Sequence, residues 1–309
     1  MIHFFNLIRW KNLLLLILTQ VLVKYALLEP LKLQYGIETS MTTSGFALLA
    51  LATVCIAAAG YIINDIEDVE ADKINKPQSV IIGKHITEQT ATYLFIGLNL
   101  LGVVMGFIIS RAVGRPSFLM LFVLASALLY IYSTYLKSIT LIGNIVVAGV
   151  ISLSIYLVGI FDLIPVATLS NRSTQFFFLD LIKDYAVFAF MLNLLREIIK
   201  DIEDIDGDYK MGVQSLPIVL GRFRTTKLVF FLSFIPLAVI ILYLSNNLYK
   251  QPLAMSYVLL FIIAPLIYVT IKLYTAELKT EYKVISNVLK LVMLTGVLSL
   301  ILFQFILIK

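Results

Sequence analysis

Two acidic segments of the chain share one spacing. Each places aspartates at positions i, i+3 and i+7, and the second set follows the first after 136 residues. The two sets are Asp65, Asp68 and Asp72, and Asp201, Asp204 and Asp208. On a helix of about 3.6 residues per turn, these steps keep the side chains on one face. The carboxylates within a set therefore repel one another, and a bound cation would relieve that repulsion.

The residue types favour a hard divalent cation. The chain has two histidines and one cysteine, so the available ligand atoms are carboxylate oxygens. Magnesium prefers oxygen ligands and is usually held by one or two carboxylates, with water and substrate phosphates completing its shell. Two facing clusters predict Mg²⁺ around a diphosphate, which it would stabilise as a leaving group. One such cluster alone could equally be a solvated acidic loop, but the repeated spacing argues against that reading.

The elements that position these aspartates are membrane-spanning helices. The chain has 309 residues, is 60% hydrophobic and 14% charged, and has a mean hydropathy of +0.97. Ordinary soluble domains carry roughly 25% charged residues, so a soluble fold is excluded. A span needs about 20 apolar residues. We predict an all-α, polytopic membrane protein with nine spans: 13–33, 43–63, 90–110, 117–136, 139–161, 180–199, 227–245, 254–273 and 286–308.

The distribution of basic residues predicts the orientation. One side of the predicted topology holds 16 lysines and arginines, and the other holds 8. The richer side should be cytoplasmic, which places the N-terminus and both acidic loops, near 64–89 and 201–226, at the cytoplasmic face of the cell (inner) membrane. Basic loops explain the net charge of +5 without a nucleic-acid partner. Nothing in the sequence indicates an obligate protein partner.

The repeated acidic motif also predicts internal duplication. One copy follows the second span and the other follows the sixth. Four intervening spans make the repeats parallel, so that both open on one side of the membrane. We predict a single transmembrane domain over 1–309, with halves of about 1–136 and 137–309 that face a central cavity.

Three motifs resemble a known family. The segments Asn64-Asp65-x-x-Asp68-x-x-x-Asp72 and Asp201-x-x-Asp204-x-x-x-Asp208 are similar to the two aspartate motifs of the UbiA superfamily of intramembrane prenyltransferases. The stretch from Tyr132 to Lys137 resembles the tyrosine–lysine motif that follows the fourth helix of that family. The resemblance covers essentially the whole chain. It implies a helical bundle whose cavity opens sideways to lipid, and Mg²⁺-dependent prenyl transfer from a prenyl diphosphate to a lipophilic acceptor.

The resemblance implies roles for particular residues. The six aspartates would hold the metal and act in catalysis, and Lys137 would contact the departing diphosphate. Substrate contacts would come from Asn64, from Tyr132, and from Arg9 and Asn12, which are similar to a basic–asparagine pair of the family. Lys76, Lys84 and Lys200 are further candidate phosphate contacts near the acidic segments, although the positive-inside bias also explains basic residues there.

The acceptor is less closely defined. Quinone-pathway members often carry two basic–proline pairs after the first motif, but here Lys76-Pro77 is followed by Gln78 without a second pair. The stretch from Arg196 to Asp208 is more similar to the geranylgeranylglyceryl phosphate geranylgeranyltransferases. We therefore expect geranylgeranyl diphosphate and geranylgeranylglyceryl phosphate as substrates. Alternatives are prenylation of 4-hydroxybenzoate or dihydroxynaphthoate and, from another class, a transporter or channel.

Overall fold

The computed structural model describes residues 2–307. Within this range the chain is helical, and extended structure is limited to an isolated bridge between Ile82 and Ile86. The prediction of an all-α fold is therefore confirmed. Residue 308, at which the last predicted span ends, lies outside the described residues.

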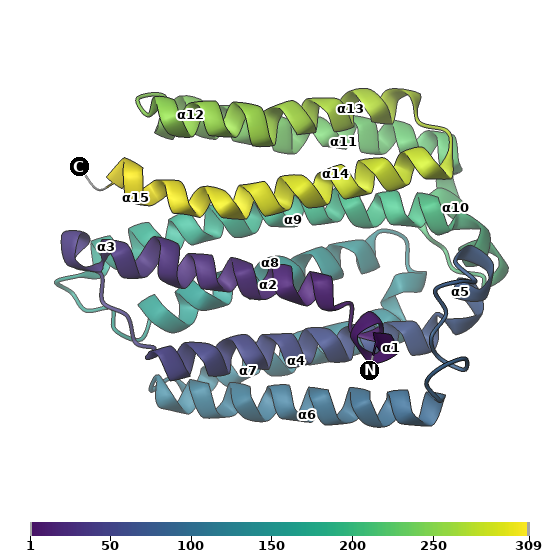
Figure 1. Ribbon diagram of the computed structural model, residues 1–309, viewed down its shortest axis with the longest axis horizontal. Coiled ribbons are helices and arrows are strands. Elements are labelled where there is room, and N and C mark those ends of the chain that lie inside the picture. Colours follow the sequence, from purple (N-terminus) through teal and green to yellow (C-terminus); the bar gives the residue numbers. More distant parts are fainter. Residues whose placement is uncertain (1, 308–309) are drawn as a thin grey trace.

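Residues 2–307 form nine long helical segments. Figure 1 shows that they run side by side along the length of the molecule. In chain order they are α2 (Trp10–Val21) with η1 (Leu22–Leu28) and α3 (Glu29–Tyr35); α4 (Thr43–Glu67); α6 (Glu88–Ala112); η2 (Pro116–Phe118) with α7 (Leu119–Thr134); α8 (Ile142–Leu163); α9 (Arg172–Lys210); α11 (Arg222–Tyr243) with η4 (Leu244–Leu248); α12 (Pro252–Val258) with η5 (Leu259–Ile263) and α13 (Ala264–Thr275); and α14 (Lys279–Leu298) with η6 (Ser299–Ile301) and α15 (Leu302–Leu307). Short helices lie between or before them: α1 (Ile2–Leu7), α5 (Val69–Asn75), η3 (Leu136–Ser138) and α10 (Leu216–Leu220).

Within the described part of the chain, eight of the nine segments are long and apolar enough to cross a membrane. The exception is α9, which has 39 residues and carries charged side chains in its first half, such as Asp180 and Lys183, as well as from Arg196 to Lys210. At 1.5 Å per residue it is about 58 Å long, well beyond the thickness of a bilayer core. The predicted sixth span, 180–199, is therefore only the middle of this helix. The prediction of an acidic loop from residue 201 was wrong over its first ten residues, which continue α9 to Lys210.

Six of the nine segments surround a cavity, and three lie outside them. The inner helices are α2, α4, α7, α8, α9 and α14, which supply the cavity lining, whereas α6, α11 and α13 pack on their outer sides. The outer helices expose large apolar side chains such as Leu100, Phe231 and Ile271. Such a surface is unfavourable in water and favourable in lipid, so the arrangement fits a bundle immersed in a membrane.

The end of the bundle away from α5 and α10 is held by buried charges. Lys24 donates to the Asp162 carboxylate at 2.7 Å and to the backbone carbonyl of Met41 at 3.1 Å. Asp162 also accepts from the Met41 backbone N–H at 2.9 Å. Both charged side chains are almost fully buried, and leaving one of them alone would be costly. The pair therefore fastens the first segment to α8 at the far end from the aspartates.

Candidate active site

The first acidic segment is divided by a break between two helices. Asn64 and Asp65 lie in the last turn of α4, Asp68 stands at the junction, and Asp72 lies in α5. At the junction Asp68 has φ −92° and ψ 2°, so the helix does not continue through it. α5 then ends at Asn75, just before Lys76-Pro77, because a residue that precedes proline disfavours the helical conformation.

Each of two carboxylates in this segment is paired with a cation from elsewhere in the chain. Arg9 donates to Asp65 at 2.8 Å, and its guanidinium lies over the ring of Tyr61. Lys137 donates to one oxygen of Asp68 at 2.5 Å, while the Asn64 amide donates to the other at 2.6 Å. The sequence motifs at Arg9, Asn64 and Lys137 are thus brought together with the first aspartates.

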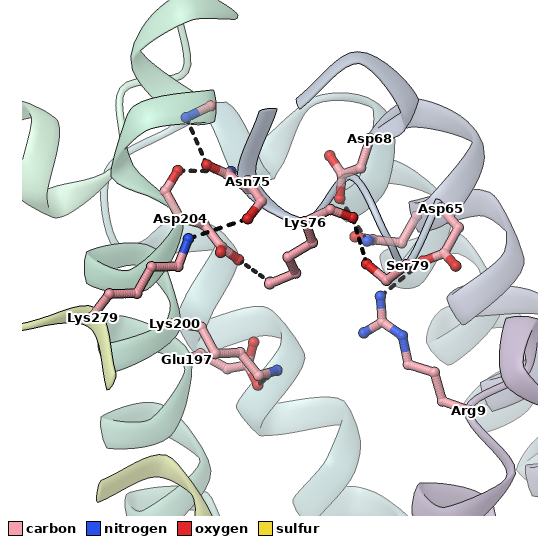
Figure 2. Close-up of polar contacts among 12 residues, drawn as sticks. Arg9, Asp65, Asp68, Asn75, Lys76, Ser79, Glu197, Lys200, Asp204 and Lys279 are labelled. Atoms are coloured by element: carbon pink, nitrogen blue, oxygen red, sulfur yellow. Dashed lines mark hydrogen bonds and ion pairs between the residues drawn. The ribbon is translucent and has the colours of Figure 1, made fainter. Parts of the chain in front are cut away.

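The second acidic segment lies on the continuous helix α9. Asp201 accepts from the Asn144 amide of α8 at 2.8 Å, and Asp204 accepts from Lys76 at 2.6 Å. Figure 2 shows Lys76 reaching from the end of α5 to Asp204, with Asp65 and Asp68 on the other side of the site. The lysine after the first motif thus binds the central aspartate of the second.

α5 and α9 are also joined by a backbone-directed contact. The side-chain amide of Asn75 donates to the carbonyl of Asp204 at 2.8 Å and accepts from the backbone N–H of Gly207 at 2.8 Å. A Cβ atom at Gly207 would lie 2.3 Å from the Asn75 amide nitrogen and 2.8 Å from the Ala71 carbonyl. Only glycine at position 207 permits α5 to approach α9 this closely. The close approach places the two acidic segments next to each other.

Both segments open onto one cavity of about 1020 Å³. Its polar end, the mouth, includes all six aspartates together with Arg9, Asn64, Lys76 and Lys137. Asn12, Tyr132 and Lys200 also line the cavity. Its deeper wall is mostly apolar and includes Leu16, Ile56, Phe122, Leu129, Val150, Leu192 and Val297. A cavity of this size with polar groups at one end suits a ligand with a charged head and a hydrocarbon tail.

One predicted contact lies elsewhere. Lys84 is exposed, is absent from the cavity wall and donates to the backbone carbonyl of Pro77 at 2.7 Å. It faces the loop that contains it rather than the aspartates. The structure therefore gives Lys84 a local role in the 76–86 loop and brings the other predicted substrate contacts together around the cavity.

The crowded charges shift ionisation at the mouth. Burial raises the pKa of Asp72 to about 6, and the neighbouring Asp68 carboxylate adds to the shift. Burial lowers the pKa of Lys76, but the combined attraction of Asp204, Asp72 and Glu203 raises the pKa overall. The carboxylates thus carry an electrostatic cost that a bound cation would reduce.

The donor set fits a hard divalent cation. Every acidic ligand at the mouth offers carboxylate oxygens, and one oxygen of Asp204 is buried without a hydrogen-bond partner. Within residues 2–307, however, no three acidic, histidine or cysteine side chains are grouped at metal-binding distance. Asp65, Asp68 and Asp204 are each turned toward a basic residue instead. The chemistry of the residues therefore fits Mg²⁺, whereas the tight clusters expected from the sequence are not formed here.

Several polar residues at the site were not predicted. Asn75 joins α5 to α9, Asn144 binds Asp201, and Lys290 of α14 lines the cavity and donates to Asn12 at 2.6 Å. Asn144 and Lys290 lie in otherwise apolar segments. Polar residues at membrane depth are often functional, and this signal in the sequence could have identified both.

Comparison with known proteins places this geometry in a family. The UbiA prenyltransferase family model matches residues 35–294. Digeranylgeranylglyceryl phosphate synthase from Methanosphaera stadtmanae is 32% identical over 260 residues, which cover 81% of this chain and 86% of that protein. The protein of the same name from Methanopyrus kandleri is 35% identical over 178 residues, and the match spans 58% of this chain and 59% of that protein.

Solved structures share the fold. A structure of digeranylgeranylglyceryl phosphate synthase has a TM-score of 0.61 and 23% identity, covering 97% of this chain and 98% of that one. A UbiA homolog from Archaeoglobus fulgidus bound to DMAPP and Mg²⁺ has a TM-score of 0.59 and 16% identity, covering 96% and 98%. At these identities the structural likeness establishes the arrangement of the helices.

Proposed function

The chain belongs to the UbiA prenyltransferase family, and we propose that it transfers a geranylgeranyl group from geranylgeranyl diphosphate to geranylgeranylglyceryl phosphate. The family assignment makes the protein a prenyltransferase and sets aside a transporter or channel. The observation that carries the proposal is the meeting of two acidic segments at the polar mouth of an apolar cavity. The names of the relatives support the choice of acceptor.

We assign Mg²⁺ binding to the six aspartates at the mouth. Support comes from their oxygen donors, from the buried and unpartnered oxygen of Asp204, and from the Archaeoglobus fulgidus homolog bound to DMAPP and Mg²⁺. When bound, the metal supplies neutralisation of the diphosphate charge. Lys76 and Lys137, which each hold an aspartate at the mouth, are the cations best placed to bind diphosphate oxygens.

The apolar wall of the cavity protects the reacting carbon from water. Transfer breaks the bond between C1 of the prenyl chain and the diphosphate oxygen, and forms a bond from the acceptor hydroxyl oxygen to C1. The hydroxyl proton leaves to solvent or to a carboxylate at the mouth. Positive charge develops on C1 during this step, and water would quench it. Leu129, Val150 and Leu192 enclose the path below the mouth and exclude water from it.

An acceptor panel tests the proposal. Purified protein, Mg²⁺ and labelled geranylgeranyl diphosphate would be incubated with geranylgeranylglyceryl phosphate, 4-hydroxybenzoate or dihydroxynaphthoate. We expect label in a diether lipid phosphate. Prenylation of an aromatic acid alone would replace this acceptor with a quinone precursor and leave the family assignment intact. Labelled product with none of the three would contradict the proposal.

We also propose that the mouth faces the cytoplasm. The 16-to-8 distribution of basic residues supports it, and prenyl diphosphates with charged heads cross bilayers poorly. Single cysteines would be placed at Gln78 and Gln214 near the mouth, and at Ser170 in the loop at the other end, in a Cys55→Ala background. An impermeant maleimide should label intact cells only at position 170. Labelling at 78 or 214 from outside would reverse the orientation.

A further inference from the structure

A second charged cluster lies deeper in the cavity than the central aspartate of α9. It comprises Arg196, Glu197 and Lys200 of α9 and Lys290 of α14, all of which line the cavity. Lys200 and Arg196 both approach Glu197, at 2.5 Å and 3.4 Å. Arg196 precedes Asp204 by eight residues, which is about 12 Å along the helix axis. Figure 2 shows Glu197 and Lys200 on the turn of α9 next to Asp204, away from the Asp65 side.

The charges of this inner cluster do not balance. Arg196 and Lys200 share the single carboxylate of Glu197, and no ion pair of Lys290 is found among the described residues. Lys76 and Lys137, in contrast, each pair with an aspartate at the mouth. The Nε atom of Arg196 is buried without a hydrogen-bond partner. Lys290 donates to the neutral amide oxygen of Asn12. Uncompensated charge at membrane depth is costly and marks sites that bind an ion or a charged group.

The nearest aspartate does not supply the missing negative charge. Successive residues of a helix are about 100° apart, so Arg196 and Lys200 lie on one side of the Glu197 direction and Asp201 on the other. Asp201 is accordingly bound by Asn144 of α8. Arg9, the other cation nearby, is paired with Asp65. The excess positive charge therefore faces the part of the cavity between α2, α9 and α14.

We propose that Arg196, Lys200 and Lys290 bind the phosphate monoester of the lipid acceptor. This site is separate from the diphosphate site and rests on the proposed function. The two substrates each bring an anionic head, and the aspartates with Mg²⁺ can serve only the diphosphate. A phosphate held by the inner cluster places the neighbouring acceptor hydroxyl below the mouth, where C1 of the prenyl chain must lie. Arginine and lysine are the side chains that bind phosphate most strongly.

A binding experiment without metal isolates this site. Protein in neutral-lipid nanodiscs with EDTA would be titrated with geranylgeranylglyceryl phosphate by calorimetry. Lys290→Gln and Arg196→Gln should each weaken binding at least about tenfold, the scale of losing a charge-assisted hydrogen bond. Lys283→Gln is the matched control, because Lys283 lies on the same helix, is exposed and does not line the cavity. Asp68→Asn should leave this binding unchanged within about twofold. Equal binding by wild type and both cluster variants would overturn the assignment.

A kinetic comparison separates the two substrates. In the presence of Mg²⁺, Lys290→Gln should raise KM for the acceptor at least about tenfold, leave KM for geranylgeranyl diphosphate within about twofold and largely retain kcat. If only KM for geranylgeranyl diphosphate increased, the cluster would bind the diphosphate and the inference would be overturned. The proposed reaction would be unaffected by that outcome.

Two further arms test the chemistry of the ligand. Geranylgeranylglycerol, which lacks the phosphate, should bind wild-type protein at least about tenfold more weakly, and Lys290→Gln should reduce that difference. Equal affinity for both lipids would overturn the proposal. The titration would then be repeated in nanodiscs that contain phosphatidylglycerol. If phosphatidylglycerol completely displaced geranylgeranylglyceryl phosphate, the cluster would be a site for bilayer head groups, and its assignment to the acceptor would be overturned.

Transfer to an aromatic acid alone in the acceptor panel would remove the proposed acceptor. The EDTA titration would still decide whether the cluster binds a phosphate monoester, so the two failures are distinguishable.

Discussion

The two acidic segments have one spacing and two different structures. The first is divided at Asp68 between α4 and α5, and its aspartates are held by Arg9 and Lys137. The second lies on the continuous helix α9, where Asn144 and Lys76 hold the aspartates. An equal spacing in sequence therefore does not give an equal arrangement of carboxylates. A break after Asp68 lets α5 turn toward α9, whereas the uninterrupted helix presents a fixed face.

This structural difference suggests different roles for α9 and α5. α9 is a continuous helix that carries aspartates at the mouth and basic residues deeper in the cavity. α5 is short and is attached to α9 through Asn75 and Gly207. We expect α9 to define the geometry of the site and α5 to complete it. The predictions below test that division of roles.

Removal of divalent metal should have the largest effect. EDTA should abolish transfer, because both segments would then lose the cation that is proposed to neutralise the diphosphate. Mg²⁺ or Mn²⁺ should restore the rate. Circular dichroism of the treated protein should be unchanged, since the helices do not depend on the metal. Full turnover in metal-free buffer would remove the metal from the mechanism.

Loss of a central aspartate should come next. Asp68→Ala and Asp204→Ala should each reduce turnover at least about 100-fold, on the scale of removing a strong transition-state electrostatic group. Glu70→Ala is the control, because Glu70 is exposed and paired only with Lys73 within the described residues, and it should stay within about twofold. Near-normal turnover of either aspartate variant would show that its segment is a solvated surface.

The attachment of α5 should matter less. Asn75→Ala removes two hydrogen bonds to α9, a loss of about 2 kcal/mol, and should lower kcat/KM about 30-fold. Gly207→Ala should have a similar effect, since its Cβ would meet the Ala71 carbonyl. Both can be measured at saturating Mg²⁺. Wild-type kinetics in Asn75→Ala would mean that α5 needs no fixed contact with α9.

The smallest effect is expected at Lys84. Lys84→Gln should change kcat/KM by less than about twofold, as is usual for an exposed residue outside the site, whereas Lys76→Gln should lower it about tenfold because Asp204 loses its cation. The pair can be assayed side by side with both substrates below saturation. A large loss at Lys84 would mean that the 76–86 loop closes over the bound diphosphate.

Sequence patterns predicted most of the fold, because long apolar runs in lipid leave few alternatives to helices. The exception was α9. Its charged second half, from Arg196 to Lys210, has the composition of a loop, but one side of it lies against α5, α10 and α11. Contacts between distant elements decided the structure there. Lys24 shows the same limit, because its buried pair with Asp162 joins residues that are remote in sequence.

The site was predictable where motifs are local. The spacing of the aspartates and the tyrosine–lysine stretch brought attention to residues that do line the cavity. Asn144 and Lys290 stand out as polar residues in apolar segments, but their partners Asp201 and Asn12 are remote in sequence and could not be predicted. Pairings of this kind depend on which helices become neighbours, and no local pattern records that. The pairing of Lys137 with Asp68 and of Lys76 with Asp204 at the mouth was not predicted, for the same reason.

The inner ring of helices has a consequence for how the protein is made. α14 closes the cavity against α2 through Lys290 and Asn12, which are 278 residues apart. At roughly 5–20 residues per second of synthesis, about 15 to 55 s separate the emergence of these two residues. During that interval the earlier spans form an open groove whose polar wall is exposed within the bilayer. We expect newly made chains to need protection by the insertion machinery until the final span arrives, and chains truncated before α14 to be degraded.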